Sequence, residues 1–215
     1  MAATLWGDRN GTEATGFLFH AEDGFASPPH IHNVSYRGVV IRGVIHNDHP
    51  DAAERWMPQG SYWTQPRGAT HITAARGDDV LAYIEIDEGP YLVRPVDEAF
   101  DSGETAVNVP ASEISWDAPE GRARSAPLWG DPSTDSPSGA LLGMPAGSRT
   151  TLRDRGRPSR AVVIQGRVRH GAGGANEGTS LPPGSYVASS GTGSVELACE
   201  GADECILYVR GEGPR

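Results

Sequence analysis

Apolar residues in this sequence occur in short runs rich in Val, Ile, Tyr and Trp, such as residues 39–41 and 81–84. The stretches between the runs hold many of the 28 Gly and 17 Pro residues. Helical periodicity is nearly absent, and its best case, residues 51–56, is long enough only for one or two turns in a loop. Short strands at regular spacing, joined by turns, predict an all-β fold of the sandwich or barrel type.

The pattern of runs occurs twice along the chain. The letters LWGD begin at residue 5 and again at residue 128, an offset of 128 − 5 = 123. Residues 39–43, VVIRG, match residues 162–166, VVIQG, at the same offset. Later matches are shifted by one or two further residues, as loop insertions in a duplicated fold would shift them.

The repeat predicts two tandem β domains, residues 1–108 and residues 109–215. Each would hold about 100 residues, within the usual size of a domain. The connector, residues 99–127, is rich in Asp, Glu, Ser, Pro and Gly. We therefore expect the two domains to pair within the chain, and a homodimer remains an open alternative.

Charge and cysteine content restrict the partners and the compartment. The formal net charge of −10 opposes binding to nucleic acid or an anionic membrane and favours a small-molecule substrate or a protein partner. No run approaches the ~18 apolar residues of a membrane helix, and the N-terminus lacks the order of a secretion signal. The two cysteines, Cys199 and Cys205, are expected to be buried thiols rather than a disulfide or a metal pair. We therefore expect a cytoplasmic protein.

The candidate chemistry begins with two histidines placed one residue apart. His30 and His32 follow the double proline at residues 28–29, and residues two apart on a strand project from the same face. Tyr36, four residues further, could join them on that face. A strand and a Pro/Gly turn at residues 60–70 then lead to His71, which could close on the first pair.

These residues resemble the two sequence motifs of the cupin superfamily. Gly24, His30, His32 and Gly43 have the spacing of the first motif, with Tyr36 where the family usually has Glu. The second motif is matched by Gly60, Pro66, Gly68 and His71, and Ala75 stands where the family has Asn. The sequence around these motifs is similar to that of uncharacterised cupins related to the cupin part of ChrR-type anti-sigma factors.

The resemblance implies two tandem jelly-roll, or double-stranded β-helix, barrels and a metal held by His30, His32 and His71. Three imidazoles favour one divalent transition metal, with Fe(II) favoured and Zn or Ni as alternatives, whereas Mg or Ca would prefer oxygen ligands. The competing interpretation is that the histidines are hydrogen-bonded polar residues at a barrel rim.

Three further residues are candidates for catalytic roles. Tyr36 could line the cavity, or coordinate the metal if deprotonated. Glu85 lies between two Ile residues, so it must face water or find a partner, which could be the metal or a substrate proton. Gln65, six residues before His71, could orient a ligand histidine through its free ring nitrogen, or could face solvent.

The second domain lacks the candidate ligands. The repeat places Arg153, Arg155 and Val195 at the positions equivalent to His30, His32 and His71. We expect a degenerate domain without metal. Arg153 and Arg155, together with Arg157, could form a basic pocket or could simply face solvent.

The resemblance of the three-histidine site to cupin dioxygenases predicts an oxidoreductase acting on a small chelating substrate. One alternative is a Zn or Ni Lewis-acid enzyme, a hydrolase, isomerase or decarboxylase, in which Glu85 or His20 moves protons. Another is a non-catalytic cupin that senses a ligand or a metal. A closed ligand shell would favour sensing, and an apolar pocket over an open position would favour catalysis.

Overall fold

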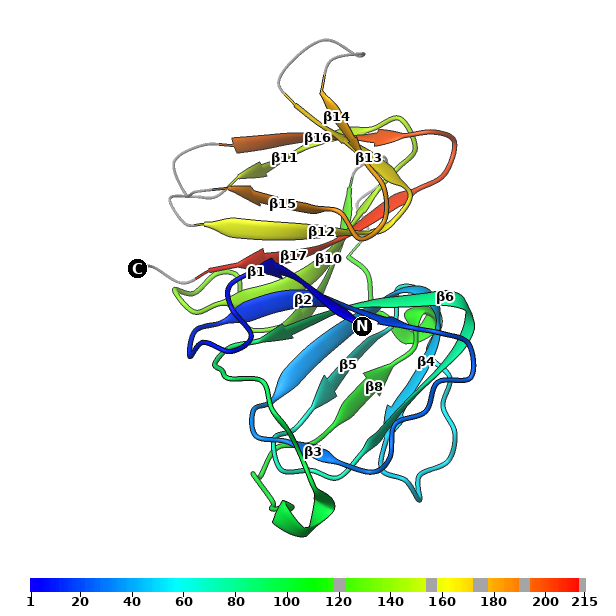
Figure 1. Ribbon diagram of the computed structural model, residues 1–215. Coiled ribbons are helices and arrows are strands. Elements are labelled where there is room, and N and C mark those ends of the chain that lie inside the picture. Colours follow the sequence, from blue (N-terminus) through cyan, green and yellow to red (C-terminus); the bar gives the residue numbers. More distant parts are fainter. Residues whose placement is uncertain (118–122, 154–157, 172–177, 190–193, 213–215) are drawn as a thin grey trace. The chain divides into compact units, whose positions relative to one another are not determined.

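The computed structural model describes residues 1–117, 123–153, 158–171, 178–189 and 194–212 (Figure 1). This part of the chain is nearly all β, with no α-helix and two short 3-10 helices. The all-β prediction is therefore confirmed. No helix in the described residues has the length and apolarity needed to cross a membrane.

The chain divides into two compact units, Met1–Ile114 and Ser115–Arg215. The sequence pattern had placed the boundary after residue 108. The secondary-structure elements of the first unit, in chain order, are β1 Ala2–Trp6, β2 Thr15–Ala21, β3 Ile31–His32, β4 Tyr36–Asp48, β5 Tyr62–Gln65, β6 Ile72–Ile86, β7 Val93–Arg94, η1 Val96–Glu98, β8 Val107–Val109 and η2 Ala111–Glu113.

The first unit contains a six-stranded sheet in the order β1-β2-β6-β4-β5-β8 and a two-stranded pair, β3-β7. The long strands β4 and β6 form its centre and pair antiparallel with two register shifts. The large sheet ends at β1 and β8 and does not close on itself, so a closed barrel is not shown.

The second unit carries two open sheets, one in the order β15-β12-β17-β10-β9 and the other in the order β11-β16-β13-β14. Its strands, in chain order, are β9 Arg124–Trp129, β10 Ser138–Met144, β11 Arg149–Arg153, β12 Ser159–Gln165, β13 Arg167–His170, β14 Thr179–Leu181, β15 Tyr186–Ser189, β16 Ser194–Glu200 and β17 Cys205–Gly211.

Strand register repeats between the units, as the sequence repeat predicts. Val39 pairs with Tyr62 and Tyr83 in the first unit, and its equivalent, Val162, pairs with Tyr186 and Tyr208 in the second. Each unit therefore uses the same three central strands in the same alignment.

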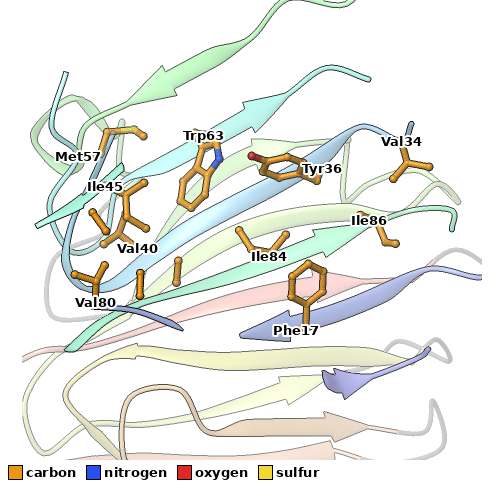
Figure 2. Close-up of a cluster of buried hydrophobic side chains, with 13 residues drawn as sticks. Phe17, Val34, Tyr36, Val40, Ile45, Met57, Trp63, Val80, Ile84 and Ile86 are labelled. Atoms are coloured by element: carbon orange, nitrogen blue, oxygen red, sulfur yellow. The ribbon is translucent and has the colours of Figure 1, made fainter. Parts of the chain in front are cut away.

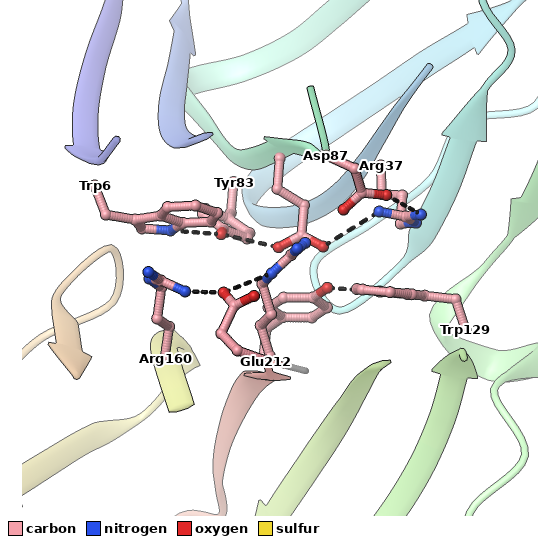
Figure 3. A network of polar contacts seen from close by, with 10 residues as sticks. Trp6, Arg37, Tyr83, Asp87, Trp129, Arg160 and Glu212 are labelled. Carbon is pink, nitrogen blue, oxygen red and sulfur yellow. Dashed lines mark hydrogen bonds and ion pairs between the residues drawn. The ribbon is translucent and has the colours of Figure 1, made fainter. Parts of the chain in front are cut away.

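A tryptophan–tyrosine hydrogen bond also occurs once in each unit (Figure 3). The indole N–H of Trp6 donates to the Tyr83 hydroxyl at 3.0 Å. In the second unit the indole N–H of Trp129 donates to the Tyr208 hydroxyl at 2.8 Å. Because a buried indole N–H or phenol needs a partner, both pairs satisfy polar groups that the packing of each sheet encloses.

The two cysteines form a disulfide, so the prediction of two buried thiols is wrong. The Cα atoms of Cys199 and Cys205 lie 5.6 Å apart, within the range that a disulfide spans. Cys199 lies near the end of β16 and Cys205 begins β17, and the bend at residues 201–203 returns the chain between them. The sequence argument for a reducing compartment therefore has no support from these residues.

Apolar residues of β2, β4, β5 and β6 fill the core of the first unit (Figure 2). Trp63 is 1% exposed and lies against Gly38, its strand partner on β4. A Cβ atom on Gly38 would meet the Trp63 ring at 2.2 Å. A glycine is therefore required there, because the indole occupies the space of a side chain.

Substitution Gly38→Ala is expected to lower the free energy of unfolding by about 1–3 kcal/mol, because the Trp63 ring must shift in a packed core. Gly211→Ala is the control, since its Cβ would meet only the Ser138 hydroxyl oxygen, at an ordinary 3.5 Å. Denaturant unfolding followed by fluorescence measures both, and equal stability of the two variants would contradict the packing argument.

Candidate metal centre

The positions of His30 and His71 are set by a β-bridge between their backbones. The N–H of His30 donates to the carbonyl of His71 at 3.0 Å, and the N–H of His71 donates to the carbonyl of His30 at 3.0 Å. Two residues that exchange both hydrogen bonds are directly opposite each other, and their side chains project from the same face. The sequence prediction that His71 closes on the first histidine pair agrees with this geometry.

His32 joins them through the short strand β3. Ile31 is buried at 1% exposure, and the alternation of a strand turns His32 to the side of His30. His32 pairs with Val93 of β7, and its carbonyl accepts from the N–H of Gly68 at 2.8 Å. Backbone contacts on both sides therefore fix the position of this residue.

Each imidazole uses Nδ1 to contact a backbone carbonyl. The distances are 2.9 Å from His30 to Pro28, 3.0 Å from His32 to Leu92 and 3.3 Å from His71 to Ala69. Since a carbonyl only accepts, each Nδ1 carries the proton, and each Nε2 presents a lone pair. Such carbonyl partners are typical of metal-binding histidines.

The three imidazoles place their ligand atoms within 4.8 Å of one another. Nε2 of His30 and Nε2 of His32 are 3.2 Å apart. Two lone pairs at that distance repel each other unless a cation lies between them. Zn–N bonds of about 2.0–2.1 Å at the tetrahedral angle would separate two nitrogens by about 3.3–3.4 Å, close to the observed value. The cluster therefore fits a divalent metal site.

Burial keeps two of the three histidines neutral. It lowers the pKa of His32 to about 3, with further lowering by the charges of His71 and His30. Burial, followed by the charge of His30, also lowers the pKa of His71 to about 3. His30 is less buried than the other two. Neutral imidazoles are ready to bind a metal without first losing a proton.

Two tyrosine hydroxyls lie beside the ligand nitrogens. The Tyr36 oxygen is 3.3 Å from Nε2 of His71, and the Tyr91 oxygen is 3.2 Å from Nε2 of His32. The Tyr91 ring also stacks on the His32 ring at 4.3 Å and 18°. Burial raises the pKa of both phenols well above its usual range, so both are protonated at neutral pH. The sequence indicated Tyr36 but gave no signal for Tyr91.

Gln65 contacts the backbone that holds His71. Its Nε2 donates to the carbonyl of Ala69 at 3.0 Å, and this carbonyl also accepts from His71 Nδ1. Gln65 therefore does not bond to the His71 imidazole directly, as the sequence suggested. Instead, both side chains donate to the same Ala69 carbonyl. Gln65 Oε1 accepts from Asn47 Nδ2 at 3.0 Å. Asn47 is buried, and sequence reasoning missed it.

Glu85 lies away from the histidines, which corrects its assignment as a metal ligand or proton-transfer base. Its neighbours Ile84 and Ile86 point into the core with Tyr36, so Glu85 faces the other side of β6. It accepts from the Tyr83 hydroxyl at 3.0 Å and lies 3.7 Å from Arg37 (Figure 3). This buried carboxylate has the partners that its charge requires.

The histidines outside the cluster have other partners. His20 Nε2 lies 2.6 Å from Asp79, and the Nδ1 atoms of His46 and His49 contact the Arg55 carbonyl and the N–H of Asp51, respectively. Within the residues that the structure describes, no second group of metal ligands occurs.

The second unit shows no counterpart of the site in its described part. Val195, the equivalent of His71, lies in β16 and packs in the apolar core of that unit. Arg155 and Arg157 lie outside the described residues, as does the side chain of Arg153. The suggested basic pocket therefore stays a prediction.

A family model described as a domain of unknown function, DUF4437, matches residues 1–214 of the chain. No match was found among curated proteins.

Three solved structures illustrate the structural similarity. A candidate dioxygenase from Nostoc punctiforme has 13% identity and a TM-score of 0.66, covering 98% of this chain and 78% of that chain. AerE from Microcystis aeruginosa has 10% identity and a TM-score of 0.60, covering 92% of this chain and 87% of that chain. Bacillus subtilis oxalate decarboxylase, described with Mn(II) centres, has 10% identity and a TM-score of 0.62, covering 95% of this chain and 70% of that chain. At such identities the similarity shows a cupin-like fold and no activity.

Replacement of any one of the three histidines by alanine is expected to abolish stoichiometric metal binding. Each supplies one of three protein ligands, and the loss of one leaves two. Elemental analysis of protein purified without a metal-binding tag measures this, with the exposed His49 as the control in His49→Ala. A histidine whose alanine variant keeps one full equivalent of metal is not a ligand.

Metal-free protein is expected to lose stability as pH falls from about 6.5 toward 3. The unfolded chain binds protons on His32 and His71 below their usual pKa of 6.5, whereas the folded state binds them only near 3. Each histidine then removes up to about 1.4 kcal/mol per pH unit from the free energy of unfolding.

Denaturant unfolding at several pH values compares wild type with His32→Asn. Carboxylates contribute equally to both proteins, so the variant is expected to show the smaller loss. Equal losses would contradict the lowered pKa of His32.

Proposed function

The chain belongs to the DUF4437 family, and from the geometry of its histidine cluster we propose that it is a metal-dependent oxidoreductase of the dioxygenase type. The observation that carries the proposal is the convergence of three imidazole Nε2 atoms, with two phenols next to them and, among the described residues, no carboxylate in the cluster. We further propose a small chelating organic molecule as the substrate. The net charge of −10 argues against nucleic acid.

The ligand set favours an anionic substrate that binds through two atoms. Three neutral imidazoles leave a divalent ion its full charge and leave positions open beside it. When bound, Fe(II) would pass electrons between a substrate and dioxygen, and a redox-silent ion such as Zn(II) or Ni(II) would act only as a Lewis acid.

The residues around the cluster are suited to hold and shield such a substrate. The hydroxyls of Tyr36 and Tyr91 lie within hydrogen-bond reach of anything that binds beside the three Nε2 atoms. Behind them, Phe17 packs against Tyr91 with ring centroids 5.2 Å apart, and Ile86 belongs to the same apolar core. An apolar wall with few polar groups orients a ligand and keeps water out.

The proposal extends to the organisation of the chain. Both units share strand register and the tryptophan–tyrosine pair, which supports two cupin-type units in one chain. The first would carry the metal, and the second would be degenerate. A relationship to ChrR-like cupins also stays a proposal.

A second candidate is a metal-dependent decarboxylase, because oxalate decarboxylases are among the structures with a similar fold. In that case the metal would polarise a substrate carboxylate without consuming oxygen. The same three histidines would hold it.

Protein loaded anaerobically with one equivalent of Fe(II) is expected to consume oxygen when a substrate from a panel of diketones, thiols, catechols and α-hydroxy acids is added. His71→Ala, which removes one ligand, is expected to lower the rate by at least about a hundredfold. His49→Ala is the control and should retain the rate.

Oxygen uptake is measured with an electrode and carbon dioxide release from oxalate by mass spectrometry. Metal binding without oxygen uptake on any of the panel, together with carbon dioxide release, would replace the dioxygenase proposal by the decarboxylase.

A further inference from the structure

A chain of buried hydrogen bonds leads from the backbone before His71 to the hydroxyl of Tyr36. Gln65 Nε2 faces two carbonyl oxygens, that of Ala69 at 3.0 Å and that of Pro66 at 3.3 Å. Carbonyls only accept, so the nitrogen of this amide must face them. Gln65 Oε1 therefore faces Asn47, and it accepts from Asn47 Nδ2 at 3.0 Å.

The orientation of Asn47 follows from that of Gln65. With Nδ2 donating to Gln65, Oδ1 of Asn47 is an acceptor on the opposite side. It accepts from the Thr73 hydroxyl at 2.8 Å and from the Tyr36 hydroxyl at 2.9 Å. Asn47 is 2% exposed, so a reversed amide would bury its oxygen against the oxygen of Gln65, two acceptors with no proton between them.

The single proton of Tyr36 is thereby directed away from the histidines. A phenol has one proton to donate, and Asn47 Oδ1 takes it. The indole N–H of Trp63 faces the same hydroxyl, and because an indole nitrogen only donates, it cannot accept that proton (Figure 2). Toward His71 the Tyr36 oxygen presents a lone pair.

Tyr91 has the opposite polarity. Its hydroxyl lies 3.2 Å from His32 Nε2, an atom that would be a ligand of a bound metal. Stacking on His32 and packing against Phe17 fix its ring. Once the His32 lone pair is engaged, the proton of Tyr91 is free to be donated to whatever binds beside that histidine.

We propose that Tyr36 and Tyr91 form a polarised pair, one accepting and one donating, that selects chelating ligands with one protonated and one bare oxygen. α-Hydroxy acids, α-hydroxy ketones and singly ionised catechols have this pattern, whereas α-keto acids and diketonates present two acceptors. Asn47 and Gln65 are positioning residues, since they act only through Tyr36. The proposal rests on the metal site of the proposed function.

The test uses zinc-loaded protein and two probes of equal charge and similar size, lactate and pyruvate. Isothermal titration calorimetry gives the ratio of the pyruvate Kd to the lactate Kd, so that no turnover is needed. In wild type the lactate hydroxyl donates to Tyr36. In Asn47→Leu the Tyr36 proton loses its Asn47 acceptor and becomes available to the ligand, which favours the pyruvate carbonyl. The ratio is expected to fall by about fivefold or more, the effect of one hydrogen bond.

Thr73→Val is the matched control. It removes the other donor to Asn47 Oδ1 but leaves the Tyr36 proton directed at Asn47, so the ratio should not change. A merely structural role for Asn47 would weaken both ligands together and also leave the ratio unchanged. A ratio in Asn47→Leu equal to that of wild type overturns the proposal.

Tyr36→Phe provides an independent variant if Asn47→Leu does not fold. It removes the acceptor for the lactate hydroxyl, so the ratio is again expected to fall, and an unchanged ratio overturns the proposal. The zinc content separates the two levels of inference. Absence of zinc from wild-type protein would remove the proposed function and this proposal with it, whereas bound zinc with ratios unaffected by either variant would remove this proposal alone.

Discussion

The backbone bridge between His30 and His71 is the constraint on which the candidate site depends. It joins two segments about forty residues apart through two hydrogen bonds of 3.0 Å and aligns their side chains. The short strand β3 then brings His32 to the same side. Because the Nδ1 atoms engage backbone carbonyls, the same framework that positions the rings also fixes which nitrogen is free. Metal-binding geometry is thus a consequence of strand pairing.

The polar interior beside the histidines links stability to selectivity. Tyr36, Asn47 and Gln65 are buried in a largely apolar core, where each donor and acceptor must be paired. Only one arrangement of the amides satisfies the carbonyls of Pro66 and Ala69. Hydrogen bonding that folding requires therefore also determines which groups the site offers to a ligand, and a substitution such as Asn47→Leu would change both properties.

The sequence allowed the histidine cluster to be predicted for two reasons. Side chains two residues apart on a strand lie on the same face, and a Pro/Gly turn before His71 brings the chain back beside the first two histidines. It did not reveal Asn47, which lies in a polar stretch that looks like an exposed turn but belongs to the long strand β4. Glu85 was misassigned because alternation does not say which face of a strand lies inside. Tyr91 lies in the loop between β6 and β7, and only tertiary packing places its ring on His32.

X-ray absorption at the metal edge of protein reconstituted with one equivalent of zinc or iron tests the central claim most directly. The account predicts a spectrum that fits three imidazole nitrogens together with oxygen ligands and no sulfur, in agreement with three converging Nε2 atoms and a disulfide that leaves no free thiol. A spectrum that requires only one or two imidazoles, or a sulfur ligand, would contradict the account and place the metal elsewhere.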